Sequence, residues 1–197
     1  MSLDHEPAPA AEGGEERVRL FVALELPDEV RDALVHWQSR ALQGLDGVRA
    51  IARSDLHATL CFLGWRWEGE IDAIRDACGV VAAYSALGLR IGEATWLPHR
   101  RPRVLAVELQ DGGALARAQA ALSEVLEAGG WYRPDKRPYL AHVTVARVGH
   151  QARAPRRAPP DLPKLSFRAT RVSLYRSRLS RSGARYEVIG SVELAGG

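Results

Sequence analysis

The sequence predicts an α+β protein with two lobes, in which antiparallel sheets form a central cleft and helices cover their outer faces. Two observations lead to this prediction. Strand-like and helix-like segments alternate along the chain, and a His-x-Thr motif occurs twice in apolar strand-like runs, at His57-Ala58-Thr59 and at His142-Val143-Thr144. Side chains of a strand alternate between its faces, so each histidine shares a face with its threonine. The two copies therefore indicate two similar half-domains that face each other.

The first half of the chain has the pattern strand, helix, strand, helix. The run from Arg17 is rich in strand formers and stops at Pro27, which cannot continue a central strand. Acidic residues then open an amphipathic helix, whose apolar residues recur at helical spacing until Gly44. We expect strands at 17–26, 48–52 and 56–63, the last ended by Gly64, and helices from 28 to Gly44 and over 68–83.

The second half begins with strands and contains the second motif. Extended segments are predicted at 87–91, 94–97 and 103–109, and a third helix has apolar residues from Leu115 to Leu126 before it ends at Gly129-Gly130. The strand of the second motif, 139–148, is followed by a connector rich in Pro and Arg. Two final strands are expected at 165–179 and 184–194, joined by a turn at 181–183.

The composition is that of a folded chain of 197 residues, 46% apolar and 26% charged. No run approaches the roughly 18 to 20 apolar residues of a membrane span, so we expect no membrane partner. Residues 1–16 hold five acidic residues but no Lys or Arg, and they have neither the features of a signal peptide nor those of a basic targeting segment. We expect a disordered acidic tail at 1–16 and a single two-lobed domain at 17–197.

Outside that tail the chain is basic. It contains all 27 Lys and Arg but only 19 of the 24 acidic residues, a net charge of about +8. The excess lies between Arg147 and Tyr186, where eleven basic residues accompany one acid, Asp161. A solvated basic face is one interpretation, but beside a pair of histidines we favour a phosphate-rich partner.

The two cysteines, Cys61 and Cys78, have no metal-binding or disulfide spacing, which favours a reduced, cytoplasmic protein. By strand alternation Cys61 shares a face with His57, although a small buried thiol is the better interpretation. A zinc site made of His57, His142 and His99 lacks any closely spaced ligand pair. No Gly-x-Ser-x-Gly signature indicates a serine nucleophile. We therefore expect neither a metal nor a cofactor.

Two histidines on either side of a substrate can share proton transfer. Imidazole titrates near neutral pH, so one ring can accept a proton while the other donates one. This division suits in-line displacement at phosphorus, in which water loses a proton and the leaving oxygen gains one. The hydroxyls of Thr59 and Thr144 could donate hydrogen bonds to the non-bridging oxygens, where negative charge builds up.

The residues that carry these motifs resemble a known family. The runs from His57 to Gly64 and from Pro138 to Arg147 are similar to the paired signatures of the two-histidine (2H) phosphoesterases, and within them to the RNA 2′,3′-cyclic phosphodiesterases, the 2′-5′ RNA ligase-like family. The segments that begin at Arg19, Arg101 and Leu174 also match. The resemblance covers about residues 17–194 and implies two lobes related by a pseudo-twofold axis.

The resemblance also implies the reaction and the roles of residues. The reaction is hydrolysis, without metal, of a 2′,3′-cyclic phosphate at an RNA end to a 2′-phosphate. His57 would be the general acid that protonates the leaving 3′ oxygen, and His142 the general base that activates water. The phosphate would be held by Thr59, Thr144 and Arg147, although strand alternation puts Arg147 on the face opposite to His142.

Aromatic residues are candidates for stacking on the terminal base. Tyr139 and Tyr175 are the preferred ones, whereas Phe62 has the alternation of a core residue. Alternative enzyme functions are action on a small cyclic nucleotide or a 2′,5′-linked oligonucleotide, and the reverse ligation. A non-enzymatic alternative is an RNA-binding module that uses the basic segment. In each case we expect a monomer.

Overall fold

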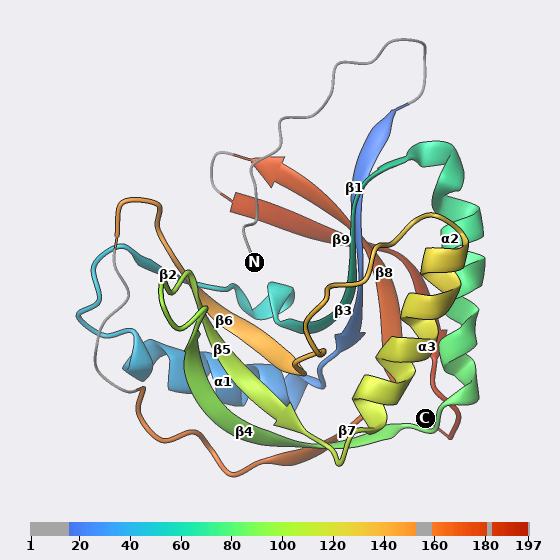
Figure 1. The fold of residues 1–197 in the computed structure, drawn as a ribbon. Coiled ribbons are helices and arrows are strands. Elements are labelled where there is room, and N and C mark those ends of the chain that lie inside the picture. Colours follow the sequence, from blue (N-terminus) through green and yellow to red (C-terminus); the bar gives the residue numbers. More distant parts are fainter. Residues whose placement is uncertain (1–15, 153–158, 181–182, 197) are drawn as a thin grey trace.

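The computed structural model describes residues 16–152, 159–180 and 183–196 (Figure 1). These residues form two antiparallel sheets with helices against them, as predicted. The predicted acidic tail lies outside the described residues except for Glu16, whose carbonyl accepts a hydrogen bond from the backbone N–H of Glu68 (2.9 Å). The predicted turn at 181–183 also lies outside them, except for Gly183.

The first lobe contains a four-stranded sheet in the order β3-β1-β8-β9. Every neighbouring pair of strands is antiparallel. The first motif lies on β3, at the edge of this sheet. The strands are β1 (Arg17–Glu25), β3 (His57–Trp67), β8 (Arg171–Ser180) and β9 (Gly183–Glu193).

The second lobe contains a five-stranded sheet in the order β2-β6-β5-β4-β7, again antiparallel throughout. The second motif lies on β6, so each sheet carries one motif strand, as predicted. The strands are β2 (Val48–Ala50), β4 (Leu87–Leu97), β5 (Val104–Gln110), β6 (His142–Val148) and β7 (Ser166–Ala169).

The two lobes repeat one chain path. In the first lobe β1 leads through α1 (Asp28–Ala41) to motif strand β3, and in the second β5 leads through α3 (Ala114–Ala128) to motif strand β6. The sheet orders β3-β1-β8-β9 and β6-β5-β4-β7 correspond strand for strand. The register agrees as well, because His57 is opposite Glu25 and His142 is opposite Glu108. This is the pseudosymmetry that the resemblance implied.

Helices α1 and α3 each pack against the motif strand of the opposite lobe. Helix α1 starts from the first lobe but packs against β6 of the second, and α3 starts from the second lobe but packs against β3 of the first. Helix α2 (Ile71–Cys78) lies beside α3, and the two run along one side of the molecule (Figure 1). Each motif strand is therefore supported from behind by the helix of the opposite lobe.

Three predicted segments have different bounds in the structure. The expected helix 68–83 consists of α2 between two 3₁₀ turns, Glu68–Glu70 and Gly79–Ala83. The expected strands 87–91 and 94–97 are one strand, β4, with an irregularity between Ile91 and Ala94. The expected strand 165–179 is divided into β7 and β8, which belong to different sheets because the chain crosses between the lobes there.

The prediction that Gly64 ends the strand of the first motif was wrong. Gly64 adopts a left-handed φ of 72° and remains in the ladder opposite Leu20, and β3 continues to Trp67. Glycine accepts this conformation without a steric penalty, so Gly64 allows an irregularity within the strand instead of terminating it.

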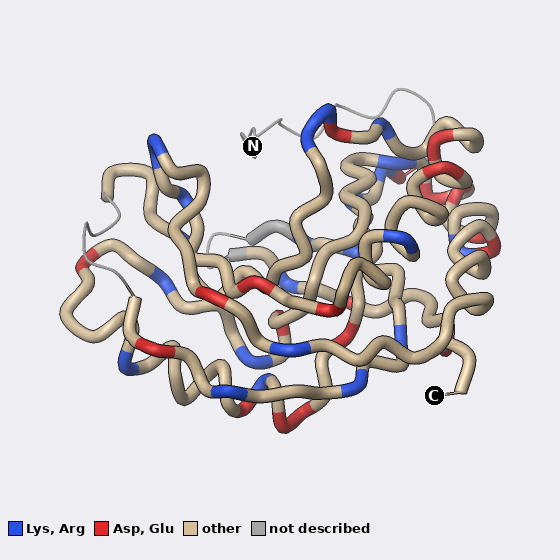
Figure 2. The backbone as a smooth tube through the Cα atoms, turned by 60° about the horizontal axis from the view of Figure 1, so that its bottom comes forward, with Lys and Arg blue, Asp and Glu red and all other residues tan. Residues whose placement is uncertain are grey.

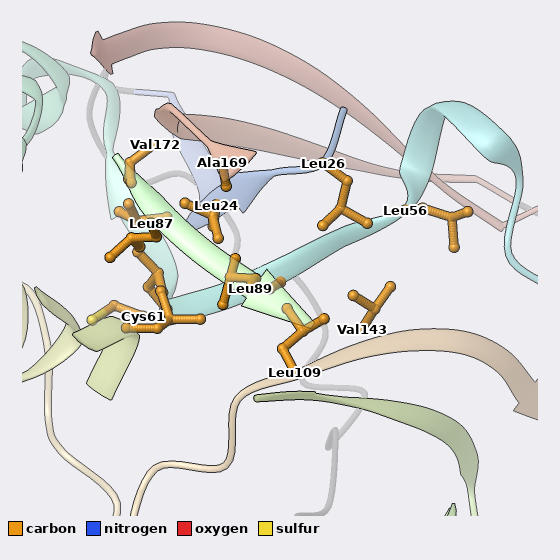
Figure 3. Packing of buried hydrophobic residues seen from close by; sticks show 14 of the residues in the cluster. Leu24, Leu26, Leu56, Cys61, Leu87, Leu89, Leu109, Val143, Ala169 and Val172 are labelled. Carbon is orange, nitrogen blue, oxygen red and sulfur yellow. The ribbon is translucent and has the colours of Figure 1, made fainter. Parts of the chain in front are cut away.

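Buried apolar residues from both lobes form one hydrophobic cluster. Figure 3 shows how Leu24, Leu56 and Cys61 of the first lobe approach Leu109 and Val143 of the second. Leu56 and Val143 each flank a motif histidine in sequence and are fully buried. The histidines are thus attached directly to the shared core, which fixes the position of their backbone.

Candidate active site

Each motif strand carries a one-residue bulge directly after its threonine. In β3 the extra residue is Leu60, because Thr59 and Cys61 pair with consecutive residues of β1. In β6 the extra residue is Val145, whose two neighbours likewise pair with consecutive residues of β5. A bulge of this kind puts two successive side chains on one side of the sheet, so the alternation shifts by one beyond it.

The bulges determine which side chains accompany the histidines. The first seven residues of both motif strands have the same burial pattern, with the first, third and sixth residue partly exposed and the others buried. The sixth residue therefore returns to the face of the histidine. We call these two faces the motif faces: the first presents His57, Thr59 and Phe62, and the second presents His142, Thr144 and Arg147.

Three expectations based on simple alternation were wrong for this reason. Arg147 lies on the same face as His142, not on the opposite one, and Phe62 lies on the motif face instead of in the core. Cys61 points away from His57 and is fully buried, which agrees with the preferred interpretation of a buried thiol. Burial raises the pKa of Cys61 to about 12, so this thiol is a poor nucleophile.

A glutamine from the supporting helix binds each bulge. The side-chain amide of Gln38 in α1 donates hydrogen bonds to the carbonyls of Val145 and Ile51. The side-chain amide of Gln119 in α3 donates to the carbonyl of Leu60 (3.4 Å). An extra residue in a strand leaves ladder groups unpaired, and a buried carbonyl needs a donor. Gln119 supplies such a donor to Leu60, and Gln38 adds a second donor to Val145, whose carbonyl also accepts from the backbone N–H of Ile51 (2.9 Å).

His57 is surrounded by aromatic rings of its own sheet. Its ring is stacked on Phe21 (centroids 4.8 Å apart) and lies 5.8 Å from the ring of Tyr175, while Tyr186 meets it edge-on at 5.3 Å. A hydrogen bond to the backbone of Asp55, two residues earlier, further fixes the imidazole. His57 is thus held in one orientation before any substrate binds.

The surroundings of His57 disfavour its charged form. Desolvation by burial is the main cause that lowers the pKa of His57 to about 4, and the positive charges of Arg147, Arg31 and His142 act in the same direction. The two motif strands, β3 and β6, are in direct contact, which agrees with the effect of Arg147 and His142 of the second lobe on His57.

His142 is oriented by its own chain. Its Nδ1 donates a hydrogen bond to the carbonyl of Leu140, two residues earlier (2.8 Å). With the proton on Nδ1, a neutral ring has its lone pair on Nε2, so that Nε2 can accept a proton. Both histidines therefore bond the backbone two residues before them, another point at which the lobes correspond.

Two further arginines lie near the histidines and were not predicted as site residues. Arg31 on α1 and Arg19 on β1 are both partly buried. The guanidinium of Arg19 donates to Ser177 Oγ (3.2 Å), and burial together with the charge of Arg147 lowers the pKa of Arg19. The guanidiniums near the histidines repel one another, and a bound anion would offset this repulsion. Their arrangement therefore favours an anionic ligand. The only sequence signal was the family-like run that starts at Arg19.

Neither of the predicted stacking tyrosines offers a free ring face. The hydroxyl of Tyr139 donates to the carbonyl of Thr59 (3.1 Å), and its ring packs against the core. Tyr175 is only 6% exposed and is stacked on Phe21, with nearly parallel rings 4.9 Å apart. Tyr139 therefore links the lobes, and Tyr175 supports His57 from behind. Phe62 and Tyr186, in contrast, are partly exposed on this side of the sheet.

The basic segment after Arg147 is partly neutralised. Three of its arginines pair with acids: Arg171 with Glu193 (2.5 Å), Arg176 with Glu68 (2.5 Å) and Arg178 with Glu187 (3.4 Å). Basic and acidic residues are interspersed over both lobes (Figure 2). The segment is thus not a continuous cationic surface in the part of the chain that the structure describes.

Among the described residues, no group of three or more His, Cys, Asp or Glu side chains could hold a metal ion. His99, the third ligand of the zinc site that the sequence did not favour, is exposed between β4 and β5. No described helix is both long and apolar enough to span a membrane.

Two pseudosymmetric lobes that bring together two His-x-Thr strands define the class of the two-histidine phosphoesterases. Within it, the chain belongs to the 2′-5′ RNA ligase superfamily, whose family model matches residues 26–181. The resemblance drawn from the two motifs is thereby confirmed.

Relatives from two bacteria illustrate the similarity. The chain is 33% identical over 189 residues to the RNA 2′,3′-cyclic phosphodiesterase of Thermus thermophilus, covering 91% of each chain. It is 29% identical over 180 residues to the Escherichia coli protein of the same name, covering 85% of this chain and 92% of that protein. A crystal structure of a T. thermophilus protein matches with a TM-score of 0.77 and 32% identity, over 90% of this chain and 98% of that one. The E. coli LigT structure without ligand gives 0.78 and 26%, over 91% and 98%.

Proposed function

We propose that this chain hydrolyses 2′,3′-cyclic phosphates at RNA ends to 2′-phosphates, with His57 as general acid and His142 as general base. The observation that carries the proposal is the matched pair of bulged strands, each of which presents a histidine and a threonine on its motif face. The names of the E. coli and T. thermophilus relatives support the substrate. Two further crystal structures of E. coli LigT contain phosphate and 3′-AMP. They match this chain with 25% and 27% sequence identity, respectively.

The reaction breaks one bond and forms one. Water attacks phosphorus and transfers a proton to Nε2 of His142, whose Nδ1 is already held by the carbonyl of Leu140. The bond from phosphorus to the 3′ oxygen breaks on the opposite side, and protonated His57 gives its proton to that oxygen. The phosphate remains on the 2′ oxygen. Exchange of one proton with solvent at each ring then restores the starting state.

Thr59, Thr144 and Arg147 would bind the phosphate. Each threonine lies two residues after its histidine on the same face, so its hydroxyl can donate to a non-bridging oxygen. The guanidinium of Arg147 can form two parallel hydrogen bonds to phosphate oxygens. Negative charge that develops on the non-bridging oxygens is thus stabilised from both lobes.

The low pKa of His57 in the free protein fits a general acid that becomes protonated only when its substrate binds. With a pKa of about 4 the ring is neutral at pH 7, mainly because of burial and in smaller part because Arg147 and Arg31 repel a further positive charge. A bound cyclic phosphate brings a negative charge among these groups, which raises the pKa of His57. Protonation is therefore coupled to binding, and the acid becomes active where a phosphate is present.

The alternatives are not favoured by a specific observation. The RNA-binding module without catalysis relied on the basic segment, three of whose arginines are paired with acids. Action on a small cyclic nucleotide, on a 2′,5′-linked oligonucleotide or in the direction of ligation would use the same histidines. The cytoplasmic location and the monomeric state stay predictions.

The proposal is tested by incubating the protein, in the presence of EDTA, with an oligoribonucleotide that ends in a 2′,3′-cyclic phosphate. We expect a 2′-phosphate as the product and a loss of at least about a hundredfold in turnover for both His57→Asn and His142→Asn. His36→Asn, on the exposed surface of α1, is the matched control and should keep full activity. A 3′-phosphate product would overturn the role of His57, and unchanged turnover in the double variant would overturn the function.

A further inference from the structure

A row of aromatic and basic side chains extends the first motif face away from the histidine. Beyond Phe62, the ladder between β3 and β1 pairs Trp65 with Arg19 and Trp67 with Arg17. Directly opposed residues of an antiparallel pair share one face of the sheet. The indoles and guanidiniums therefore continue the face that carries His57. We call this row, which consists of Phe62, Trp65, Trp67, Arg17 and Arg19, the aromatic–arginine row.

The row is accessible and cationic. Trp67 is 40% exposed, and the side chains of Phe62 and Trp65 are partly exposed. The guanidinium of Arg19 lies 4.5 Å from the centroid of the Phe62 ring, and that of Arg17 lies 5.0 Å from the Trp67 ring. Aromatic faces with guanidiniums beside them are the combination that binds single-stranded nucleic acid, through base stacking and phosphate contacts.

The chemistry determines on which lobe the rest of the RNA lies. In the proposed reaction the leaving 3′ oxygen belongs to the ribose, and it receives its proton from His57. The ribose must therefore lie on the side of the first lobe, whereas the attacking water lies on the side of His142. Since the chain that precedes the terminal nucleotide is attached to the same ribose, it leaves the site over the first motif face.

Equivalent positions of the two lobes differ in the way this polarity requires. Phe62 and Arg147 are each the sixth residue of a motif strand, behind equivalent bulges. The first lobe has a ring there, suited to a nucleoside, and the second has a cation, suited to a phosphate. The comparison of these equivalent positions thus indicates that the nucleoside lies toward the first lobe and the phosphate toward the second.

We propose that the aromatic–arginine row binds the nucleotides on the 5′ side of the cyclic phosphate, so that the enzyme prefers oligoribonucleotides to cyclic mononucleotides. This inference rests on the proposed function. A strand rises about 3.3 Å per residue, so Phe62 and Trp67 are roughly 15 Å apart. At about 3.4 Å per nucleotide in a stacked strand, this length takes roughly four nucleotides, and fewer if the RNA is extended.

The test compares adenosine 2′,3′-cyclic phosphate with oligoadenylates of two, four and six nucleotides that end in the same group. For the unaltered protein we expect kcat/KM to rise with length up to about four nucleotides. Trp67→Ala should lower kcat/KM for the hexamer about tenfold through KM, and leave the mononucleotide within about twofold. Trp67→Phe should restore most of the loss, because it keeps an aromatic face. Arg17→Gln should weaken hexamer binding and its salt dependence, whereas Arg40→Gln, on the exposed surface of α1, should not.

Failure of the inference can be told from failure of the proposed function. Equal kcat/KM for all lengths, or an equal loss for mononucleotide and hexamer in Trp67→Ala, would overturn the row as an RNA-binding surface. Absence of turnover on every substrate would overturn the proposed function instead. In that case, binding of a 2′-phosphorylated hexamer that is weakened by Trp67→Ala would still support the row, and binding that is unaffected by it would overturn it.

Discussion

The side-chain amide of Gln38 donates a hydrogen bond to the carbonyl of Val145, the extra residue of the bulge in β6. Gln38 is almost fully buried, and α1, which carries it, comes from the other lobe. This contact connects a helix residue without any catalytic group to the orientation of Arg147, because the bulge is what returns Arg147 to the motif face. Gln38 is thus a positioning residue.

Replacement of Gln38 by leucine should affect both stability and phosphate binding. It removes the side-chain donor from the partly buried carbonyl of Ile51 and one of the two donors from the carbonyl of Val145, which keeps the backbone N–H of Ile51. The expected cost is about 1 to 3 kcal/mol of unfolding free energy. We expect a several-fold increase in KM and a smaller change in kcat. Urea denaturation and steady-state kinetics check these outcomes.

Gln119→Leu is the matched comparison, because Gln119 binds the equivalent bulge at Leu60. It should also destabilise the protein, but its effect should fall on the position of Phe62, hence on oligonucleotide substrates more than on phosphate. Identical kinetic changes in both variants would show that the bulges act only through global stability.

Removal of the hydroxyl of Tyr139 should loosen the contact between the lobes at the site. Its hydrogen bond to the carbonyl of Thr59 joins the segment before β6 to the first motif strand. Tyr139→Phe keeps the packed ring, so the expected loss of unfolding free energy is that of one hydrogen bond, about 1 kcal/mol. If the hydroxyl also aligns Thr59 with the substrate, kcat decreases several-fold at constant KM. A variant with lower stability and unchanged kcat would limit Tyr139 to a structural role.

The sequence was sufficient for the architecture and the motif residues but not for the faces beyond the threonines. Most strands and helices followed from apolar periodicity, which depends on burial alone, and the placement of one motif strand in each lobe followed from the repeated His-x-Thr motif. Apolar periodicity does not reveal the position of a bulge. Leu60 and Cys61 are both apolar and buried, and so are Val145 and Ala146. Alternation therefore assigned Phe62, Cys61 and Arg147 to the wrong faces. A comparison of the two motif strands with each other contained a hint, because an apolar pair follows each threonine.

The depressed pKa of His57 predicts a specific loss of stability in acid. The unfolded chain binds a proton at this residue near pH 6.5, but the folded protein does so only near pH 4. The contribution is therefore fully present above about pH 6.5 and is lost as the pH falls toward 4, by about 2 to 3 kcal/mol. His57→Asn lacks this titration, so its unfolding free energy should fall less between about pH 7 and pH 4.5. Carboxylates that titrate in this range are common to both proteins and cancel in the comparison.

Phosphate should reverse the depression of the His57 pKa. In the free protein, burial and the charges of Arg147, Arg31 and His142 hold this pKa at about 4, which can be followed through the imidazole resonances in an NMR titration. Inorganic phosphate bound among these groups introduces negative charge, so the pKa of His57 should rise by at least about one unit.

Arg147→Gln separates two influences on the pKa of His57, the repulsion by the guanidinium charge and the binding of phosphate. Loss of the guanidinium charge should raise the pKa of His57 in the free protein, because one of the charges that repel its proton is gone. The same variant should bind phosphate more weakly, so that the additional rise on adding phosphate becomes smaller at equal concentration. Arg40→Gln, distant in sequence and exposed on α1, controls for the change in net charge. If the pKa of His57 stays near 4 with saturating phosphate, the protonation of the acid is not coupled to substrate binding, and His57 would have to act as a neutral hydrogen-bond donor.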